Sequence, residues 1–212
     1  MYRENGFYHI YNRGVDKKPI FHDKIDYKTF LKYLKEALNP PKIDLQGATL
    51  QRKTKNFHNE ITLCCFSLMP NHFHLLVKQK EARTIHKFIQ SVMIRYAMYF
   101  NKRYKRFGPL FQSDFKATNI LDDAYLLHIT RYIHRNQLKL GISITEGYSS
   151  YANYIGKRHT PWVNTMIILD YFHPEKYSML KHTQSYRDFV ENFTPSETEE
   201  SLNDALLCDE NE

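Results

Sequence analysis

Two histidines separated by one apolar residue, His72 and His74, are the first residues in this chain whose spacing suggests chemistry. They open a run of apolar residues that ends near Val77. If the run is a β-strand, side chains alternate between its two faces, so the imidazoles project together while Phe73 and Leu75 point the other way. Two imidazoles so placed suit two ligands of one metal ion. A bare His-x-His pair is more often incidental on an exposed strand, so this interpretation depends on a second group of residues downstream.

The second group lies on a helix expected over residues 122–140, where residues 131–136 read Arg-Tyr-Ile-His-Arg-Asn. Residues four apart share a helix face, so Tyr132 and Asn136 project together, with Arg131 and Arg135 alongside. A single tyrosine on an amphipathic helix usually belongs to the core or the surface. Only its combination with the histidine pair favours a catalytic role.

Together the two groups meet the requirements for cleavage of a DNA strand by a tyrosine. A phenol has a pKa of about 10 and is a poor nucleophile at neutral pH. A divalent cation can bind a non-bridging phosphate oxygen, hold the phosphodiester for in-line attack and offset the developing charge. His72, His74 and the amide oxygen of Asn136 would supply three ligands, a mixed set that suits Mg²⁺ or Mn²⁺ with open positions. Attack by Tyr132 would form a phosphotyrosyl intermediate whose bond energy allows the strand to be resealed.

The spacing of apolar residues predicts the elements that position these groups. Strands are expected over residues 7–12, 61–69, 72–78 and 110–120, with the middle two forming an antiparallel hairpin. Helices are expected over residues 23–38, 84–104 and 122–140, the second capped by Thr84 and the third ending at Gly141. This order predicts an α+β fold, a ferredoxin-like sandwich in which a four-stranded antiparallel sheet carries its helices on one face.

Three regions are expected along the chain. Residues 1–141 form the core, residues 142–193 form an accessory segment with short helices around 167–172 and 186–193, and residues 194–212 form an acidic, disordered tail. Residues 39–58 are polar and lysine-rich, which predicts a loop. No apolar run approaches the roughly 20 residues of a membrane span, no signal peptide is evident, and the three cysteines fit reduced thiols rather than disulfides or a zinc site. These features predict a cytoplasmic protein with no membrane partner.

The distribution of charge predicts a polyanionic partner. The formal net charge is +7, but the tail from Thr194 onward holds seven acidic residues and no Lys or Arg, which leaves +14 on residues 1–193. A body this basic, in a chain with 16 Tyr and 14 Phe, favours a nucleic acid whose bases stack on aromatic rings. The residues expected to contact DNA on this basis are Lys102, Arg103, Lys105, Arg106, Arg131 and Arg135. A solvated helix end is the alternative interpretation of the first four.

Four motifs of this chain resemble those of the single-tyrosine HUH transposases, and within them the REP-associated tyrosine transposases. They are residues 8–14 (Tyr-His-Ile-Tyr-Asn-Arg-Gly) with 19–21 (Pro-Ile-Phe), residues 69–76 (Met-Pro-Asn-His-Phe-His-Leu-Leu), residues 108–112 (Gly-Pro-Leu-Phe-Gln) with 115–116 (Phe-Lys), and residues 131–136. Residues 148–151 (Tyr-Ser-Ser-Tyr) and Trp162 add a further similarity. The resemblance spans roughly residues 7–193, and its second and fourth motifs are the most specific.

The resemblance implies roles for the residues singled out above. His72, His74 and Asn136 become the metal ligands, and Tyr132 becomes the nucleophile that forms a 5′-phosphotyrosine and leaves a free 3′-hydroxyl. It further implies DNA transposition, with single-stranded DNA folded into short, REP-like hairpins as the substrate. The motifs add Arg13 and Lys116 as expected DNA contacts. Relatives include monomers and homodimers, so both states stay open, and the expected location is the nucleoid of a prokaryote.

The chain departs from the family at two places. Asn136 is followed by Gln137, where the family often has Pro. Gln112 is followed by Ser113 and Asp114, where many relatives have Gly-Arg, so a negative charge replaces a positive one at an expected DNA contact. Neither change removes a catalytic group.

Two other functions stay open on this sequence. A ferredoxin-like nucleic-acid-binding protein that is catalytically inactive would carry the same basic and aromatic residues, although a decayed copy should have lost one of the chemical groups. A rolling-circle initiator or relaxase usually places its tyrosine differently relative to the histidines. Because every chemical group is present, we expect an enzyme, a metal-dependent transposase.

Overall fold

An antiparallel sheet of four strands forms the centre of the computed structural model, which describes residues 2–41, 55–173 and 185–193. The strands are β1 (Phe7–Arg13), β2 (Ile61–Met69), β3 (His72–Gln79) and β4 (Lys116–Ile120), in the spatial order β2-β3-β1-β4. The predicted hairpin of β2 and β3 and the predicted α+β class are confirmed. Most of the loop expected over residues 39–58, and the whole acidic tail, lie outside the described residues.

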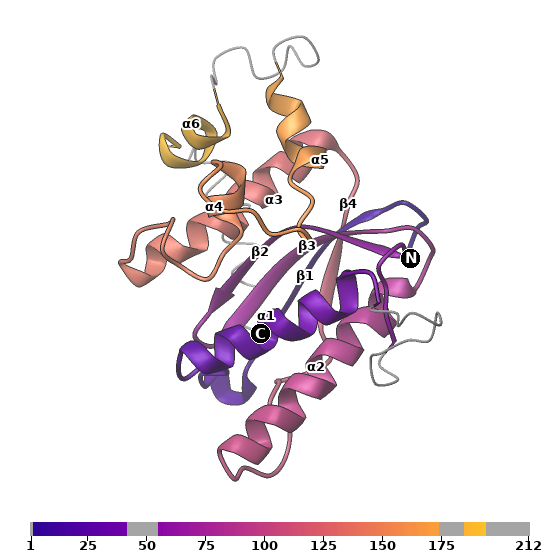
Figure 1. Ribbon diagram of the computed structural model, residues 1–212, viewed down its shortest axis with the longest axis vertical. Coiled ribbons are helices and arrows are strands. Elements are labelled where there is room, and N and C mark those ends of the chain that lie inside the picture. Colours follow the sequence, from indigo (N-terminus) through magenta and orange to yellow (C-terminus); the bar gives the residue numbers. More distant parts are fainter. Residues whose placement is uncertain (1, 42–54, 174–184, 194–212) are drawn as a thin grey trace, which may run out of the picture.

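Helices α1 (Lys24–Leu38) and α2 (Thr84–Arg103) lie next to each other across one face of the sheet (Figure 1). The Asp23 carboxylate caps α1 by accepting hydrogen bonds from the backbone N–H groups of Ile25 and Asp26. At the start of α2 the cap position is held by Arg83 in the left-handed conformation, with φ 68°. Thr84, predicted as the cap, is therefore the first residue of the helix.

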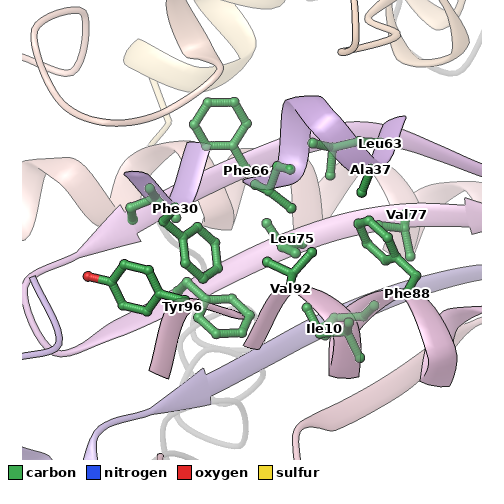
Figure 2. Close-up of a cluster of buried hydrophobic side chains, with 14 of the residues drawn as sticks. Ile10, Phe30, Ala37, Leu63, Phe66, Leu75, Val77, Phe88, Val92 and Tyr96 are labelled. Atoms are coloured by element: carbon green, nitrogen blue, oxygen red, sulfur yellow. The ribbon is translucent and has the colours of Figure 1, made fainter. Parts of the chain in front are cut away.

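The main core lies between this face of the sheet and the two helices (Figure 2). Ile10 of β1 and Leu75 and Val77 of β3 point toward Phe88 and Val92 of α2. All five side chains are fully buried. Each removes apolar surface from water at roughly 25 cal/mol per Å², so alternate residues of the two central strands hold both helices in place.

Helix α3 (Asp123–Arg135) lies on the opposite face of the sheet, so the expectation that all helices share one face is corrected. The face that carries the histidines also carries Cys65 and Leu76, which are fully buried in a second apolar cluster. Leu126, Ile129 and Ile133 of α3 belong to the same cluster. Apolar surface on both faces of the sheet needs a cover, and α3 supplies it on this face.

Strand β2 changes face at an irregularity between Leu63 and Cys65. Leu63 pairs with Val77, whereas Cys65 already pairs with Leu76, so one extra residue, Cys64, is inserted. Residues two apart on a regular strand share a face, and this β-bulge places Leu63 and Cys65 on opposite faces instead. Both described cysteines are free thiols, as predicted, and burial raises the pKa of Cys64 to about 12.

Strand β4 is shorter than predicted, since it begins at Lys116 rather than near residue 110. Residues 110–115 run instead as a loop that meets Gly14 through an isolated bridge at Phe111. The backbone N–H of Val15 donates to the Leu110 carbonyl. These contacts tie the loop after α2 to the loop after β1, at the end of the sheet where β3 begins.

After α3 the chain continues as the 3₁₀ helix η2 (Asn136–Leu140), which ends at Gly141 with φ 65°, as predicted. The accessory segment contains α4 (Tyr151–Tyr154), α5 (Met166–Leu169), η3 (Asp170–Phe172) and α6 (Tyr186–Glu191). Tyr151, Tyr154 and Tyr186 of these helices pack in the cluster on the α3 side of the sheet (Figure 1). Tyr148 and Val163, between η2 and α5, pack instead against the main core. Within the part of the chain that the structure describes, no helix is long and apolar enough to cross a membrane.

We predict that Phe73→Ala lowers the free energy of unfolding by about 3–5 kcal/mol, because it leaves a cavity in the main core. Phe73 is 0% exposed and packs on Phe30 and Phe111. Urea denaturation measures the change. The control is Phe107→Ala, since Phe107 is 95% exposed and its truncation should leave stability nearly unchanged. A similar effect of the two substitutions would contradict this packing.

Candidate active site

The strand register places polar side chains in rows on the face of the sheet that α3 covers. Residues directly opposite each other in antiparallel strands project from the same face. Tyr11 of β1 pairs with His74 of β3 and with Lys116 of β4, and Arg13 pairs with His72. The predicted metal ligands and two of the predicted DNA contacts therefore share one surface.

The two histidines at the start of β3 are held by neighbouring side chains. Their ring centroids are 5.0 Å apart, and the rings are nearly perpendicular. Nδ1 of His72 lies 2.7 Å from Oδ1 of Asn71, and Nδ1 of His74 lies 2.9 Å from Nε2 of His9. Because each Nδ1 is engaged in this way, Nε2 is the atom that each ring would offer to a metal ion.

Tyr132 lies beside the histidines in the same chain. Its ring is edge-on to His74 with the centroids 5.5 Å apart, and its centroid is 6.1 Å from that of His9. Nζ of Lys139, on η2, lies 5.3 Å from the centre of the tyrosine ring. The fold thus brings the predicted nucleophile and the predicted ligand pair together and places a cation next to the phenol.

Asn136, the predicted third ligand, is the first residue of η2 and is buried. Its Nδ2 donates to the Tyr132 carbonyl at 3.1 Å, while its Oδ1 accepts no hydrogen bond from the described residues. The next residue, Gln137, donates to Ser67 Oγ at 2.7 Å and to the Leu68 carbonyl at 3.1 Å. Ser67 is the β2 residue paired with His74, so these bonds dock η2 against the row of side chains that contains the histidine.

Gln137 departs from the family pattern, and the structure gives it a positioning role. A proline at this position would have no side-chain donor for β2. Gly147 packs so closely on Gln137 that a Cβ at this glycine would lie 2.1 Å from Oε1 of the amide. The glutamine and the glycine therefore form a matched contact that fixes η2.

The donor set fits a hard divalent cation. Among residues 2–41, 55–173 and 185–193, no three His, Cys, Asp or Glu side chains are grouped to hold a metal ion. The two imidazoles therefore need a third ligand of another type. The buried Oδ1 of Asn136 is an amide oxygen that accepts no hydrogen bond there, and such oxygens are ligands that Mg²⁺ and Mn²⁺ accept.

A buried hydrogen-bond network joins α3 to the accessory segment. Nδ1 of His134 lies 2.7 Å from the Tyr186 hydroxyl on α6, and its Nε2 lies 2.8 Å from Ser150 Oγ. Ser150 Oγ also accepts a hydrogen bond from the backbone N–H of Phe66 on β2. Burial lowers the pKa of His134 to about 3, because the imidazolium would lose its hydration. A neutral imidazole therefore fixes the helix that carries Tyr132.

Helix α6 and the residues after it cover the two arginines next to Tyr132. The Arg131 guanidinium lies 3.6 Å from the ring centre of Phe193 and 4.4 Å from that of Phe189, and Arg131 is only 8% exposed. Arg135 donates to the Val190 carbonyl at 2.6 Å, and burial lowers its pKa. Both side chains thus anchor the accessory segment, and their contact with DNA stays a prediction.

The other predicted DNA contacts lie near the end of the sheet where β3 begins. Arg103 forms ion pairs with Asp23 and Asp26, which gives its charge a structural partner. Arg106 donates to Asn101 Oδ1 and the Pro109 carbonyl, and Arg13 donates to Gln112 Oε1. The exposed cations of the group are Lys102 and Lys105.

Sequence reasoning missed three residues of the site: His9, Asn71 and Lys139. His9 and Asn71 lie within the first two motifs quoted above, but the motifs gave neither residue a role. Along the strand expected over residues 7–12, His9 has the same phase as Tyr11. That phase becomes informative only once the register against β3 is known. Lys139 was missed because the expected α-helix becomes a 3₁₀ helix at residue 136. This change alters the direction in which later side chains point.

Comparisons with known proteins identify the family and the fold. A family model described as "Transposase IS200 like" matches residues 3–136. Among solved structures, a REP-associated tyrosine transposase bound to a REP hairpin has a TM-score of 0.53 at 9% identity, covering 77% of this chain and 94% of that chain. At this identity the likeness shows the fold alone.

A second solved structure, of a candidate transposase from Deinococcus radiodurans R1, has a TM-score of 0.39 at 14% identity. It covers 61% of this chain and 88% of that chain. No curated protein matches the sequence.

We predict that, because of His134, the metal-free protein loses stability as the pH is lowered. Its folded pKa of about 3 lies below the usual value of 6.5, so between these values the unfolded chain binds a proton that the folded protein does not. The stabilisation is complete above pH 6.5 and is lost as the pH falls toward 3. Between pH 7 and pH 5 this should remove about 2 kcal/mol.

Urea denaturation at the two pH values measures this loss in the wild type, in His134→Gln and in the exposed control His86→Gln. The His134 variant should be less stable at pH 7 but should lose about 2 kcal/mol less on acidification. The control should behave like the wild type. Equal pH dependence in all three proteins would show that His134 is not the responsible group.

Proposed function

The chain belongs to the IS200-like transposase family, and we propose that it cleaves and rejoins single-stranded DNA through a covalent bond to Tyr132. The observation that carries this proposal is the position of the Tyr132 ring, 5.5 Å from that of His74 in the same chain. No second copy is needed to bring the two groups together. We therefore infer that cleavage occurs within one protomer, whatever the oligomeric state.

In the first step, Oη of Tyr132 attacks the phosphorus atom of a phosphodiester. The bond from phosphorus to the phenolic oxygen forms, and the bond to the 3′-oxygen breaks, which leaves a 5′-phosphotyrosine and a free 3′-hydroxyl. The phenolic proton passes to solvent, and the departing 3′-oxygen takes a proton from solvent to become the hydroxyl. The ammonium of Lys139 near the ring favours the phenolate. Rejoining reverses the step, because a DNA 3′-hydroxyl attacks the phosphotyrosine and Tyr132 leaves.

His72, His74 and Asn136 would hold the divalent ion, Mg²⁺ or Mn²⁺. When bound, this ion supplies Lewis-acid activation of the phosphate and compensates for its charge. The protein's own contribution is orientation, since Gln137 docks η2 on β2 and the His134 network fixes α3. Both the nucleophile and the third ligand are therefore held on elements that cannot shift independently.

We propose hairpin-forming DNA as the substrate class. Residues 1–193 carry a net charge of +14, which favours a polyanion. The loops after β1 and α2 meet at the end of the sheet where β3 begins. The exposed Lys102 lies in the last turn of α2, and the exposed Lys105 lies on the loop that follows it. A protein with this fold has been seen with a REP hairpin, which supports a folded single strand as the ligand here.

We predict that Tyr132→Phe abolishes the covalent protein–DNA adduct, because it removes only the attacking oxygen. The assay is denaturing gel electrophoresis after incubation with a labelled single-stranded hairpin oligonucleotide and Mn²⁺. Tyr125→Phe, about two helical turns earlier on α3, is the matched control and should retain the adduct. An adduct of normal yield with Tyr132→Phe would assign the nucleophile to another tyrosine.

We also predict that His72→Ala, or chelation with EDTA, stops cleavage and leaves hairpin affinity within about threefold. Binding should depend on Lys and Arg contacts with phosphates rather than on the metal ligand. Fluorescence anisotropy measures the affinity, and the same gel measures the cleavage. Parallel loss of both activities would indicate that His72 has a structural role. Cleavage that survives both treatments would refute the metal-dependent mechanism and leave a DNA-binding protein with a different chemistry.

A further inference from the structure

We infer that Asn71 and His9 are positioning residues that together direct Nε2 of both histidines toward the divalent ion. The inference rests on the proposed function, since it assigns to the same site the groups that set its ligands. A neutral imidazole carries one proton, and only the nitrogen without that proton can bind a metal. Whichever group engages Nδ1 therefore decides whether Nε2 is available.

Asn71 sets the state of His72 through a chain of hydrogen bonds from the backbone. Nδ2 of Asn71 donates to the Lys17 carbonyl at 3.1 Å, so its amide oxygen has to face the other way. That oxygen lies 2.7 Å from Nδ1 of His72. An amide oxygen only accepts, so Nδ1 must carry the proton, and Nε2 keeps its lone pair.

The backbone around Asn71 is itself fixed. The N–H of Gly14 donates to the Asn71 carbonyl at 2.8 Å, and Ile20 and Phe21 donate to the Pro70 carbonyl. At Gly14, an added Cβ would lie 2.2 Å from the Lys18 carbonyl oxygen, so no other residue fits this turn. The loop after β1 thus holds the amide that orients the first ligand.

His9 sets the state of His74 from the neighbouring strand. Its Nε2 is 2.9 Å from Nδ1 of His74, and the two rings stack with their centroids 5.1 Å apart. Both side chains are at most 1% exposed, so water does not compete for this hydrogen bond. When His74 donates from Nδ1 to His9, its own Nε2 has the lone pair that the ion requires.

The position of His9 gives it a second contact within the site. Its ring stacks on Tyr11 and also forms a T-shaped contact with Tyr132. One buried imidazole on β1 therefore touches both the ligand and the nucleophile. If His9 served only for packing, its ring nitrogens would not be needed. A substitution that keeps an aromatic ring but removes the nitrogens, His9→Phe, therefore tests the inference.

The test compares Mn²⁺ affinity in three variants and a control, measured at one pH by the electron paramagnetic resonance signal of free Mn²⁺ and without DNA. His9→Phe and Asn71→Leu lose the acceptor for Nδ1 and should bind Mn²⁺ about 10–100-fold more weakly. His9→Gln places an amide oxygen near the position of Nε2 and should stay within about threefold of the wild type. His86 is an exposed residue of α2. His86→Phe makes the same His-to-Phe exchange away from the site and should not change the affinity.

A second measurement needs no metal. In the ¹⁵N-labelled apoprotein, long-range ¹H–¹⁵N correlations should show the proton of His72 and of His74 on Nδ1. His9→Phe should shift the proton of His74 toward Nε2, and Asn71→Leu should do the same for His72. His9→Gln, which is expected to fold, should retain the wild-type pattern.

The outcomes separate the two proposals. If wild-type protein and His9→Phe bind Mn²⁺ equally and His74 keeps its proton on Nδ1, the inference is refuted while the proposed function stands. If the wild type binds no Mn²⁺, the metal chemistry of the proposed function is refuted and this inference with it. Equal weakening by His9→Phe and His9→Gln, with unchanged proton positions, would reduce His9 to a packing residue.

Discussion

The antiparallel pairing of β1 with β3 is the constraint on which the other features of this protein depend. Each strand alternates between an apolar face and a face with polar groups, and the register places Tyr11 opposite His74 and Arg13 opposite His72. A slip of one residue would turn all of these side chains to the other face. It would also remove Ile10 and Leu75 from the main core, so the apolar core that holds α1 and α2 protects the geometry of the polar face. Stability and chemistry are in this way linked through one register.

The polar face is buried, although most of its groups prefer water. His74 and Asn136 are at most 1% exposed, and Tyr132 is 7% exposed. Such burial carries a cost unless each polar atom has a partner. Most of these groups offset the cost of burial through short hydrogen bonds, as His74 does with His9 and Gln137 does with Ser67. The amide oxygen of Asn136 accepts no hydrogen bond from the described residues, and a bound cation would offset the cost of burying it.

The accessory segment is an integral part of the structure that holds α3 in place. Tyr151, Tyr154 and Tyr186 share an apolar cluster with Ile129 and Ile133 of α3. The neutral imidazole of His134 connects the same helix to two parts of this segment. Arg131 and Arg135, on the same helix as Tyr132, interact with Phe189 and Phe193, which shows that part of the positive charge of this chain serves packing through cation–π contacts. Charge in the sequence therefore overstates the basic surface that is available to DNA.

Local patterns determined much of this protein. Runs of apolar and strand-forming residues predicted β1, β2 and β3, the spacing from residue 23 to residue 38 predicted α1, and Gly141 marked the end of the helical region. The pair of histidines and the Tyr-Asn spacing were visible for the same reason, since residues two or four apart on one element have a known relative direction. Cap and strand boundaries were less certain, as Arg83 and the short β4 show, because tertiary contacts such as the bridge from Gly14 to Phe111 override local preference.

Only the tertiary structure decided which elements face each other. The sequence did not contain the register that places His9 against His74, the bulge at Cys64 that turns β2 over, or the choice of the sheet face that α3 covers. Each of these depends on contacts between residues far apart in the chain. Such contacts produce no periodic pattern in the sequence, because residues far apart in the chain become neighbours when strands pair. The sequence determined which residue types are available for the candidate site, and the fold determined which of them lie in contact.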